Sequence, residues 1–364
     1  RRNFVMMGGV ALLGIGAAGA LSACSSGGTP APTGSPTSTS SGAPKKGGTL
    51  RVGVTGGAQS DTLDAQNIVT NTDFARIPQL YDQLVTMNDA GQVTYQLAES
   101  IEPNADATEW TIKVRSGVVD HAGKAFGAKD VLFSLQRIVD KKYPGASSIG
   151  PINFKESKLV DDRTLTVKFD KPYAIFKDAL SIVYFFMVPE GYDPKTPIGT
   201  GPFKYKSFTP GVESTFERFD QYWQTGLPYL DSVVITNIAD ETGQVNGFQS
   251  GQLDAIVYLS ASSVAALTGS NAQILATKTG SWGPITMAVD MDPFTDVKVR
   301  QAMKLIVDRE QMRKQVFGEY GSIGNDMFGV FDPLFDTSIP QRNQDIEQAK
   351  SLLKSAGKEG LTVD

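Results

Sequence analysis

Histidine and cysteine are almost absent: the 364 residues contain one of each. A zinc finger, a multi-histidine metal site or a disulfide framework needs more than one such residue. The sequence therefore excludes all three, together with most Cys/His catalytic arrangements. Carboxylates, hydroxyls, aromatic rings and the backbone must carry the function.

Basic residues are also scarce beyond the N-terminus. The net charge is −5, yet the first sixty residues contain five basic residues and no acidic one. The remainder is therefore more acidic than the net charge suggests. This makes it a poor nucleic-acid binder, because phosphate neutralisation needs clustered Lys and Arg. With 40% hydrophobic and 20% charged residues, the composition is that of a folded soluble protein, and the length suggests two or three domains.

The N-terminus has the order of an export signal, with a positive end, an apolar middle and small residues at the close. Paired arginines precede a Gly- and Ala-rich apolar run that ends in LSAC at 21–24, an order similar to a bacterial lipobox. We expect residues 1–23 to be removed as a signal peptide and Cys24 to be lipidated. The exported protein would then be anchored to the outer face of the bacterial cytoplasmic membrane. The alternative is a transmembrane anchor with an incidental cysteine.

The segment after Cys24 has no side chain to bury. Residues 25–48 contain only Ser, Thr, Gly, Ala and Pro apart from two lysines, so we expect residues 24–48 to form a flexible linker. The arginine pair at the start is also similar to the twin-arginine export motif, although a generic basic leader has the same appearance.

Patterned segments follow the linker. β-Branched or alternating runs predict strands, and apolar residues at helical spacing predict helices. The strands are expected at 49–54, 109–115, 233–235, 255–258 and 287–289, with a hairpin at 159–169. The helices are expected at 77–85, 131–138, in a segment ending near 251, at 296–317 and at 345–356. Residues 361–364 begin a further strand, and a strand without its partner is an unusual terminus. We therefore expect the sequence, which starts with Arg, to be cut at both ends.

Several of these stretches resemble one family in sequence and in order. The matching stretches are GGTLRVGV at 47–54, LYDQLV at 80–85, LAESIEPNADATEWTIKVRSGVVDHAGKAFGAKDVLFSLQRI at 97–138, GTGPFKY at 199–205, Tyr222-Trp223 with LPYLD at 227–231, GQLD at 251–254 and PFTDVKVRQAMKLIVDRE at 293–310. Together they are similar to the oligopeptide/dipeptide/nickel class of extracytoplasmic solute-binding proteins, family 5, which serve bacterial ABC importers.

The resemblance implies an α/β fold, a two-lobed clamshell of the periplasmic-binding-protein type with an inserted subdomain. It places residues 49–65 and 195–290 in the first lobe and residues 66–194 in the inserted subdomain. Residues 291–364 would begin a second lobe that is truncated here. Asp290 stands where many relatives carry Asn at the crossing between the lobes, and we expect Asp290 and Met291 to form the hinge.

The candidate ligand-binding residues come from the ends of strands, because ligands of α/β lobes bind where loops leave the sheet. The loop after the first strand offers Gln59, Ser60 and Asp61. Tyr258 ends a later strand, and Trp282 precedes the predicted crossing strand. Aromatic walls and hydroxyls can bind a peptide chain without reading its side chains. The alternative for the two aromatic residues is a place in the core.

Three other features have simpler explanations. His121 follows Asp120, but neighbours in a turn rarely face each other, so we expect a solvated turn histidine. The segment at 290–296 lacks the glycine and the oxygen ligand of a calcium loop, so we expect no metal. Gly199 and Gly201 are expected to serve a tight turn.

The leading hypothesis is a substrate-binding lipoprotein of an ABC importer, which captures oligopeptides or dipeptides by hinge closure and delivers them to permease subunits. We expect a monomer with no catalytic residue, cofactor, metal or nucleic-acid partner. A secreted lipid-tethered hydrolase and a ligand sensor without transport stay open as alternatives. For the ligand, a nickel chelate, a sugar oligomer or a siderophore also stays open.

Overall fold

The computed structural model describes residues 44–363 apart from seven positions. These positions are Asp89, Lys278, Gly280, Phe328, Phe331, Pro333 and Leu334. The predicted signal peptide, Cys24 and most of the predicted linker lie outside the described residues. Helices and strands mix along the described part, as an α/β fold requires.

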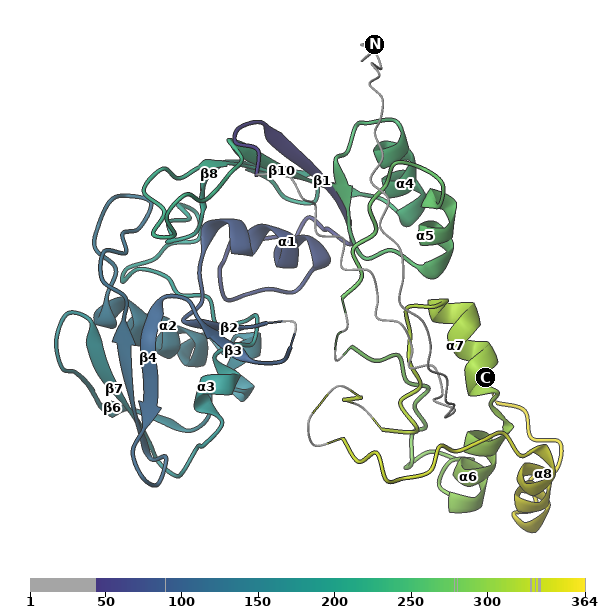
Figure 1. The fold of residues 1–364 in the computed structure, drawn as a ribbon. Coiled ribbons are helices and arrows are strands. Elements are labelled where there is room, and N and C mark those ends of the chain that lie inside the picture. Colours follow the sequence, from purple (N-terminus) through teal and green to yellow (C-terminus); the bar gives the residue numbers. More distant parts are fainter. Residues whose placement is uncertain are drawn as a thin grey trace, which may run out of the picture. The chain divides into compact units, whose positions relative to one another are not determined.

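A five-stranded sheet is built from segments far apart in the sequence (Figure 1). Its order is β11-β1-β10-β9-β8, with β1 at Thr49–Thr55, β8 at Phe203–Thr209, β9 at Glu213–Arg218, β10 at Ser232–Ile238 and β11 at Ala255–Ile256. β1 pairs in parallel with β10 and β11, whereas β8, β9 and β10 pair antiparallel. The strands predicted at 49–54 and 233–235 are confirmed, and the strand predicted at 255–258 ends earlier, at Ile256.

Helices α1 (Asn71–Leu80) and α4 (Glu241–Gln249) pack against this sheet, and α5 (Ala261–Leu267) follows α4 (Figure 1). Thr70 begins α1 with a capping box, since its hydroxyl accepts from the Asp73 amide while the Asp73 carboxylate accepts from the Thr70 amide. One apolar core joins α1 to the strands; it includes Val54, Ile77, Leu80, Tyr81, Phe186, Val188, Phe203, Phe216, Val233 and Ile235. The helix predicted to end near 251 is confirmed as α4.

A second, four-stranded antiparallel sheet has the order β4-β5-β7-β6. Its strands are β4 (Ala98–Pro103), β5 (Glu109–Val114), β6 (Ile152–Leu159) and β7 (Thr164–Phe169). The elements that accompany this sheet are α2 (Ala128–Asp140), α3 (Phe176–Ala179), a 3₁₀ turn (Pro144–Ser147) and the hairpin of β2 (Val85–Met87) and β3 (Val93–Tyr95). Trp110, Ile112 and Val114 are buried in its core. The predicted strand at 109–115, hairpin at 159–169 and helix at 131–138 are all confirmed.

The helix predicted at 77–85 overlaps α1 only at residues 77–80, because α1 begins earlier, at Asn71, and ends earlier than predicted. α1 ends at Leu80, and Tyr81 is already extended (φ −134°, ψ 151°). Leu80 and Tyr81 belong to the core of the five-stranded sheet, whereas Leu84 and Val85 belong to the core of the other sheet. The apparent helical spacing therefore came from two cores that take up consecutive parts of one segment. Helix α1 falls within the predicted inserted subdomain, yet its buried residues Ile77 and Leu80 pack in the core of the five-stranded sheet.

The C-terminal part contains α6 (Val297–Ile306), α7 (Arg309–Phe317) and α8 (Ile346–Ser355), with Ala302, Leu305 and Ala349 in a small core. The prediction of one helix over 296–317 is wrong, because Val307 is extended (φ −82°, ψ 121°) and Asp308 starts a second helix by accepting a hydrogen bond from the Gln311 amide. The helix predicted at 345–356 is confirmed as α8.

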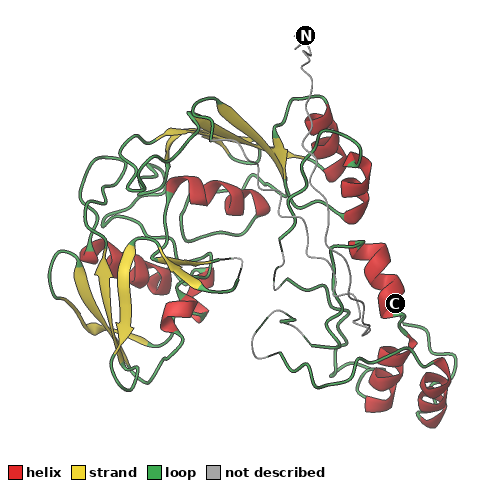
Figure 2. Cartoon of the chain, in the orientation of Figure 1, coloured by secondary structure: helices red, strands yellow, loops and turns green. Residues whose placement is uncertain are grey.

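Two predicted strands are absent from the described residues. The segment at 287–289 has no strand and lies in the loop drawn between α5 and α6 (Figure 2), and residues 361–363 are likewise irregular. Both predictions rested on a short β-branched or apolar run. Such a run forms a strand only beside another strand, and neither segment pairs with one here.

Candidate functional site

The carboxyl ends of three strands meet at one edge of the five-stranded sheet. This follows from the parallel pairing of β1 with β10 and β11, in which Thr55 lies beside Ile238 and Gly53 lies beside Ile256. The loop after β1 leaves from this edge and carries Gln59 and Ser60, both exposed. Tyr258 leaves from the same edge after β11. The structure therefore places these three predicted ligand-binding residues on loops at the carboxyl ends of β1 and β11. We call the place where the carboxyl ends of β1, β10 and β11 meet the shared edge.

The loop after β1 is held in place by the end of β10. Asn237 accepts a hydrogen bond from the Gly57 amide (2.9 Å) and donates to the Gly211 carbonyl oxygen in the turn between β8 and β9 (2.9 Å). Gly57 fits only because it lacks a side chain, since a Cβ there would collide with the Asn237 side chain. Gln59 is therefore presented on a fixed loop.

Asp61 lies at the inner end of this loop and is buried. Its carboxylate accepts hydrogen bonds from the Ala58 amide (3.0 Å), the Thr70 and Thr72 hydroxyls (3.2 and 3.1 Å) and Arg76 Nη2 (3.1 Å). Burial raises the pKa of Asp61, but the Ala58 amide and the Arg76 guanidinium outweigh it and leave the pKa below its ordinary value. The observed contacts of Asp61 fix the loop to α1, and a ligand contact stays a prediction.

The other predicted residues lie in the segment between α5 and α6, which has no helix or strand among its described residues. Trp282, Asp290 and Met291 are all exposed there. The alternative that Tyr258 and Trp282 are core residues does not fit their exposed fractions of 61% and 60%. The hinge assignment of Asp290 and Met291 stays a prediction.

Sequence reasoning missed a carboxylate just after α1. Asp82 accepts hydrogen bonds from the Thr200 hydroxyl (3.0 Å), the Tyr222 hydroxyl (3.0 Å) and Trp223 Nε1 (2.9 Å), none of which carries a charge. Burial raises the pKa of Asp82 to about 6, against the opposing effect of the three hydrogen bonds. The Tyr222-Trp223 pair is visible in the sequence, but no local pattern connects it to an aspartate 140 positions earlier.

His121 is not the solvated turn residue that the sequence predicts. Its Nδ1 accepts from the Gly199 amide (3.2 Å), and its Nε2 lies 3.0 Å from the Gly201 carbonyl oxygen, so these partners select the neutral ring with its proton on Nε2. The ring packs edge-on against Phe219, with centroids 5.0 Å apart. Burial lowers the pKa of His121 to about 4. A local turn pattern cannot reveal a partner segment that lies 78 positions away.

The structural role predicted for Gly199 and Gly201 is confirmed. A Cβ on either residue would collide with the backbone of Leu80, the last residue of α1. The turn that they form therefore packs closely against the end of α1. Two hydrogen bonds fix it, one from the Thr200 hydroxyl to the Asp82 carboxylate and one from the Gly199 amide to His121 Nδ1.

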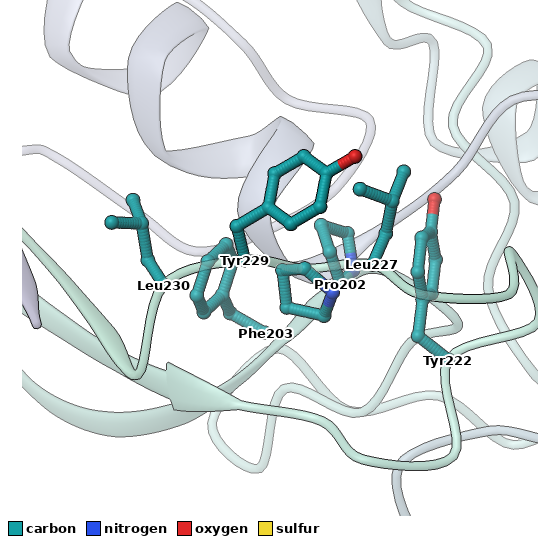
Figure 3. A pocket seen from close by; sticks show the side chains of 7 residues that line it. Pro202, Phe203, Tyr222, Leu227, Tyr229 and Leu230 are labelled. Carbon is teal, nitrogen blue, oxygen red and sulfur yellow. The ribbon is translucent and has the colours of Figure 1, made fainter. Parts of the chain in front are cut away.

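Two pockets lie away from the shared edge. The first, of about 270 Å³, is apolar and is lined by Pro202, Phe203, Tyr222, Leu227, Pro228, Tyr229 and Leu230 (Figure 3). The second, of about 330 Å³, is lined by His121, Lys195, Thr196, Pro197, Ile198, Lys204, Tyr205 and Glu217. Neither contains Gln59, Ser60 or Tyr258. The predicted ligand-binding residues therefore lie outside both of these cavities.

Among the described residues, no three His, Cys, Asp or Glu side chains come together as metal ligands would. Within the same part of the chain, none of the helices has the length and apolar character needed to cross a membrane.

The sequence of this chain is similar to those of known solute-binding proteins. Heme-binding protein A of Haemophilus influenzae is 28% identical over 322 residues, and the dipeptide-binding protein of Escherichia coli is 27% identical over 327 residues. These alignments cover 80% and 81% of this chain but only 59% and 61% of the relatives, so the chain spans about three fifths of their length.

A solved structure shows the same fold. The periplasmic binding protein DppA of Helicobacter pylori, solved with the peptide STSA, superimposes with a TM-score of 0.72 at 22% identity, covering 86% of this chain and 67% of that one. The family model described as bacterial extracellular solute-binding proteins, family 5 middle, matches residues 92–363, well over half of the sequence. The chain belongs to family 5 of the bacterial extracellular solute-binding proteins.

Proposed function

We propose that this chain is the ligand-capturing part of an ABC importer and that its ligand is a short peptide. Family membership supports capture of a solute outside the cytoplasm. A relative named as a dipeptide-binding protein and a structural neighbour solved with a tetrapeptide support a peptide as that solute. The name of another relative makes heme the competing ligand.

The observation that carries the proposal is the shared edge, where Gln59, Ser60 and Tyr258 stand on loops after parallel strands. The amide and hydroxyl of the first two residues can bond the backbone of a peptide, and the ring of Tyr258 offers flat contact area at little cost in rotamer entropy. These contacts are independent of peptide sequence, which suits a receptor for many peptides.

The proposed mechanism is hinge closure. A ligand that touches both lobes would stabilise the closed form, with Asp290 and Met291 at the hinge and Trp282 beside the ligand. Moving such an equilibrium from 1:99 to 99:1 needs about 5.5 kcal/mol of preference for the closed form. The closed form would then deliver the peptide to the permease subunits.

Anchoring is part of the same proposal. Lipidation of Cys24 after removal of residues 1–23 would hold a monomeric receptor at the outer face of the cytoplasmic membrane. The mass of the N-terminal peptide of the protein purified from membranes tests this. A diacylglycerol adduct on Cys24 supports it, and an unmodified cysteine contradicts it.

The ligand is tested by calorimetric titration of the full-length protein with Ser-Thr-Ser-Ala, trialanine and hemin. We expect both peptides to bind and to raise the Tm, and Tyr258→Ala to weaken peptide binding at least tenfold. Tyr205→Ala is the matched control, because Tyr205 is a half-exposed tyrosine on β8, away from the shared edge. Binding of hemin without either peptide would overturn the peptide assignment.

A further inference from the structure

Tyr258 combines an unusual backbone with an exposed ring. Its φ is +59°, in the left-handed region that favours glycine, although the residue carries a large side chain that is 61% exposed. A non-glycine residue stays in this region only where its surroundings enforce it, and such positions gather at ligand sites. The contacts that enforce it should therefore be found in the residues on either side.

Both sides of Tyr258 are held by one helix. Gln244 Nε2 donates to the Val257 carbonyl oxygen (3.2 Å), directly before the tyrosine, and the Glu241 carboxylate accepts from the Ser260 amide, two positions after it. Glu241 and Gln244 are three positions apart on α4 and so lie on the same face of that helix. The helix itself is fixed at its start, where Asp240 accepts from the Gly243 amide (2.7 Å).

Gln244 also ties the loop to the sheet. The same Nε2 donates to the Gly53 carbonyl oxygen of β1 (2.8 Å), so one amide group on α4 links β1 to the residue that follows β11. Gln244 is fully buried, and its Oε1 has no hydrogen-bond partner among the described residues. Burying an amide with an unbonded oxygen is costly, and the two hydrogen bonds from Nε2 offset this cost.

The Glu241 carboxylate is likewise held by hydrogen bonds from the segment after Tyr258. Burial raises the pKa of Glu241, but the Ser260 amide and neighbouring serine hydroxyls outweigh this and leave the pKa below its ordinary value. The carboxylate therefore stays charged at neutral pH and remains a strong acceptor for the Ser260 amide.

We propose that Glu241 and Gln244 are positioning residues that fix the backbone on both sides of Tyr258 and so hold its ring outward at the shared edge. The consequence for binding rests on the proposed function, because it requires that Tyr258 meets the ligand. The conformational part is independent of any ligand.

The conformational part is tested by amide hydrogen exchange of residues 257–260 in the full-length protein. We expect Glu241→Ala to speed exchange of the Ser260 amide at least tenfold and Glu241→Gln, which keeps an acceptor oxygen, to restore most of the protection. Gln244→Met keeps the volume but loses both donors, and it should loosen the same segment. Gln249→Met, at an exposed position of α4, and Val245→Ala, which removes buried volume from α4, are controls that should leave the Ser260 amide protected.

The binding part is tested with Ser-Thr-Ser-Ala as the probe. We expect Gln244→Met to weaken its affinity about tenfold in the parent protein and to have no further effect in a Tyr258→Ala background. A merely structural role would weaken binding equally in both backgrounds and would overturn the proposal, as would unchanged exchange in Glu241→Ala. If the peptide does not bind the parent protein, the proposed function fails, and the exchange measurement alone decides whether Glu241 and Gln244 position Tyr258.

Discussion

Helix α1 lies between two carboxylates whose partners differ in charge. Before its first turn, Asp61 is bonded to the Arg76 guanidinium (3.1 Å) as well as to neutral donors, whereas Asp82, just beyond its last turn, is bonded to two hydroxyls and an indole. The pKa of Asp61 is lowered despite its burial, and burial raises the pKa of Asp82 to about 6. At Asp82, three neutral hydrogen bonds do not replace the water that the carboxylate loses on burial, whereas at Asp61 the Ala58 amide and the Arg76 guanidinium together outweigh that loss.

Removing the Arg76 guanidinium beside Asp61 should destabilise the protein more than any other substitution that tests this comparison. Arg76 is 1% exposed and bonds Asp73 Oδ1 (2.9 Å) as well as Asp61, and both carboxylates are fully buried. Arg76→Met would leave two buried carboxylates without a cation. We expect a loss of about 3–5 kcal/mol in the free energy of unfolding, measured by urea denaturation.

Arg51→Met is the matched control, since Arg51 forms a comparable ion pair with Asp254 (2.6 Å) at the surface. Water screens and solvates that pair, so its loss should move the urea midpoint far less. Equal effects of the two substitutions would contradict the role assigned to burial.

The second prediction concerns pH. The folded pKa of Asp82, about 6, lies above the ordinary 3.8, so its contribution to stability grows as the pH falls through 6 toward 4. The folded pKa of His121, about 4, lies below the ordinary 6.5, so its contribution is lost over the same range. Each shift corresponds to about 3 kcal/mol, and the two nearly cancel in the parent protein.

Single substitutions separate the two contributions. Between pH 7 and pH 4, Asp82→Asn should lose stability relative to the parent, because only His121 still titrates. His121→Gln should gain stability relative to the parent over the same range. The measurement is the free energy of unfolding at each pH, and groups other than these two cancel in the difference from the parent. Variants whose pH curves run parallel to the parent curve would rule out both assignments.

Local patterns predicted which side of an element is buried, but not what it is buried against. Alternation at 109–115 was sufficient to place Trp110, Ile112 and Val114 in the core. The same reasoning took the segment at 77–85 for one helix, because it could not distinguish one core from two. It also predicted strands at 287–289 and 361–364, where strand formation depends on a neighbouring strand.

In the candidate site, too, the sequence predicted local features but not contacts between distant segments. The strand-end rule selected Gln59, Ser60 and Tyr258, and the parallel pairing of β1 with β10 and β11 brings their loops to one edge of the sheet, while their contact with a ligand stays a prediction. The contacts of His121 with Gly199 and of Asp82 with Trp223 join segments 78 and 141 positions apart. Nothing local in the sequence encodes such pairs, so only the folded structure reveals them.

A third prediction compares asparagine at the two carboxylate positions. At pH 7.5, Asp61→Asn should cost about 1–3 kcal/mol, because it weakens a charge-assisted hydrogen bond to Arg76. Asp82→Asn should be neutral or stabilising. Its oxygen can accept from Trp223 and Thr200, its amide can donate to the Tyr222 hydroxyl, and the charge that burial disfavours is gone. Urea denaturation of the pair measures the contrast, and a greater loss at position 82 would reverse it.

Removing one neutral donor from Asp82 should have a small effect on stability and a direct effect on the pKa of this carboxylate. Tyr222→Phe removes one of the three neutral donors to Asp82 (3.0 Å) and should cost about 1 kcal/mol. Because that hydrogen bond lowers the pKa of Asp82, its loss should raise the pKa above 6, measured by ¹³C NMR of the Asp82 carboxyl group. Tyr205→Phe, at a half-exposed position, is the control. An unchanged pKa in Tyr222→Phe would mean that this hydrogen bond does not oppose the effect of burial on Asp82, and the contrast with Asp61 would then rest on the other partners of the two carboxylates.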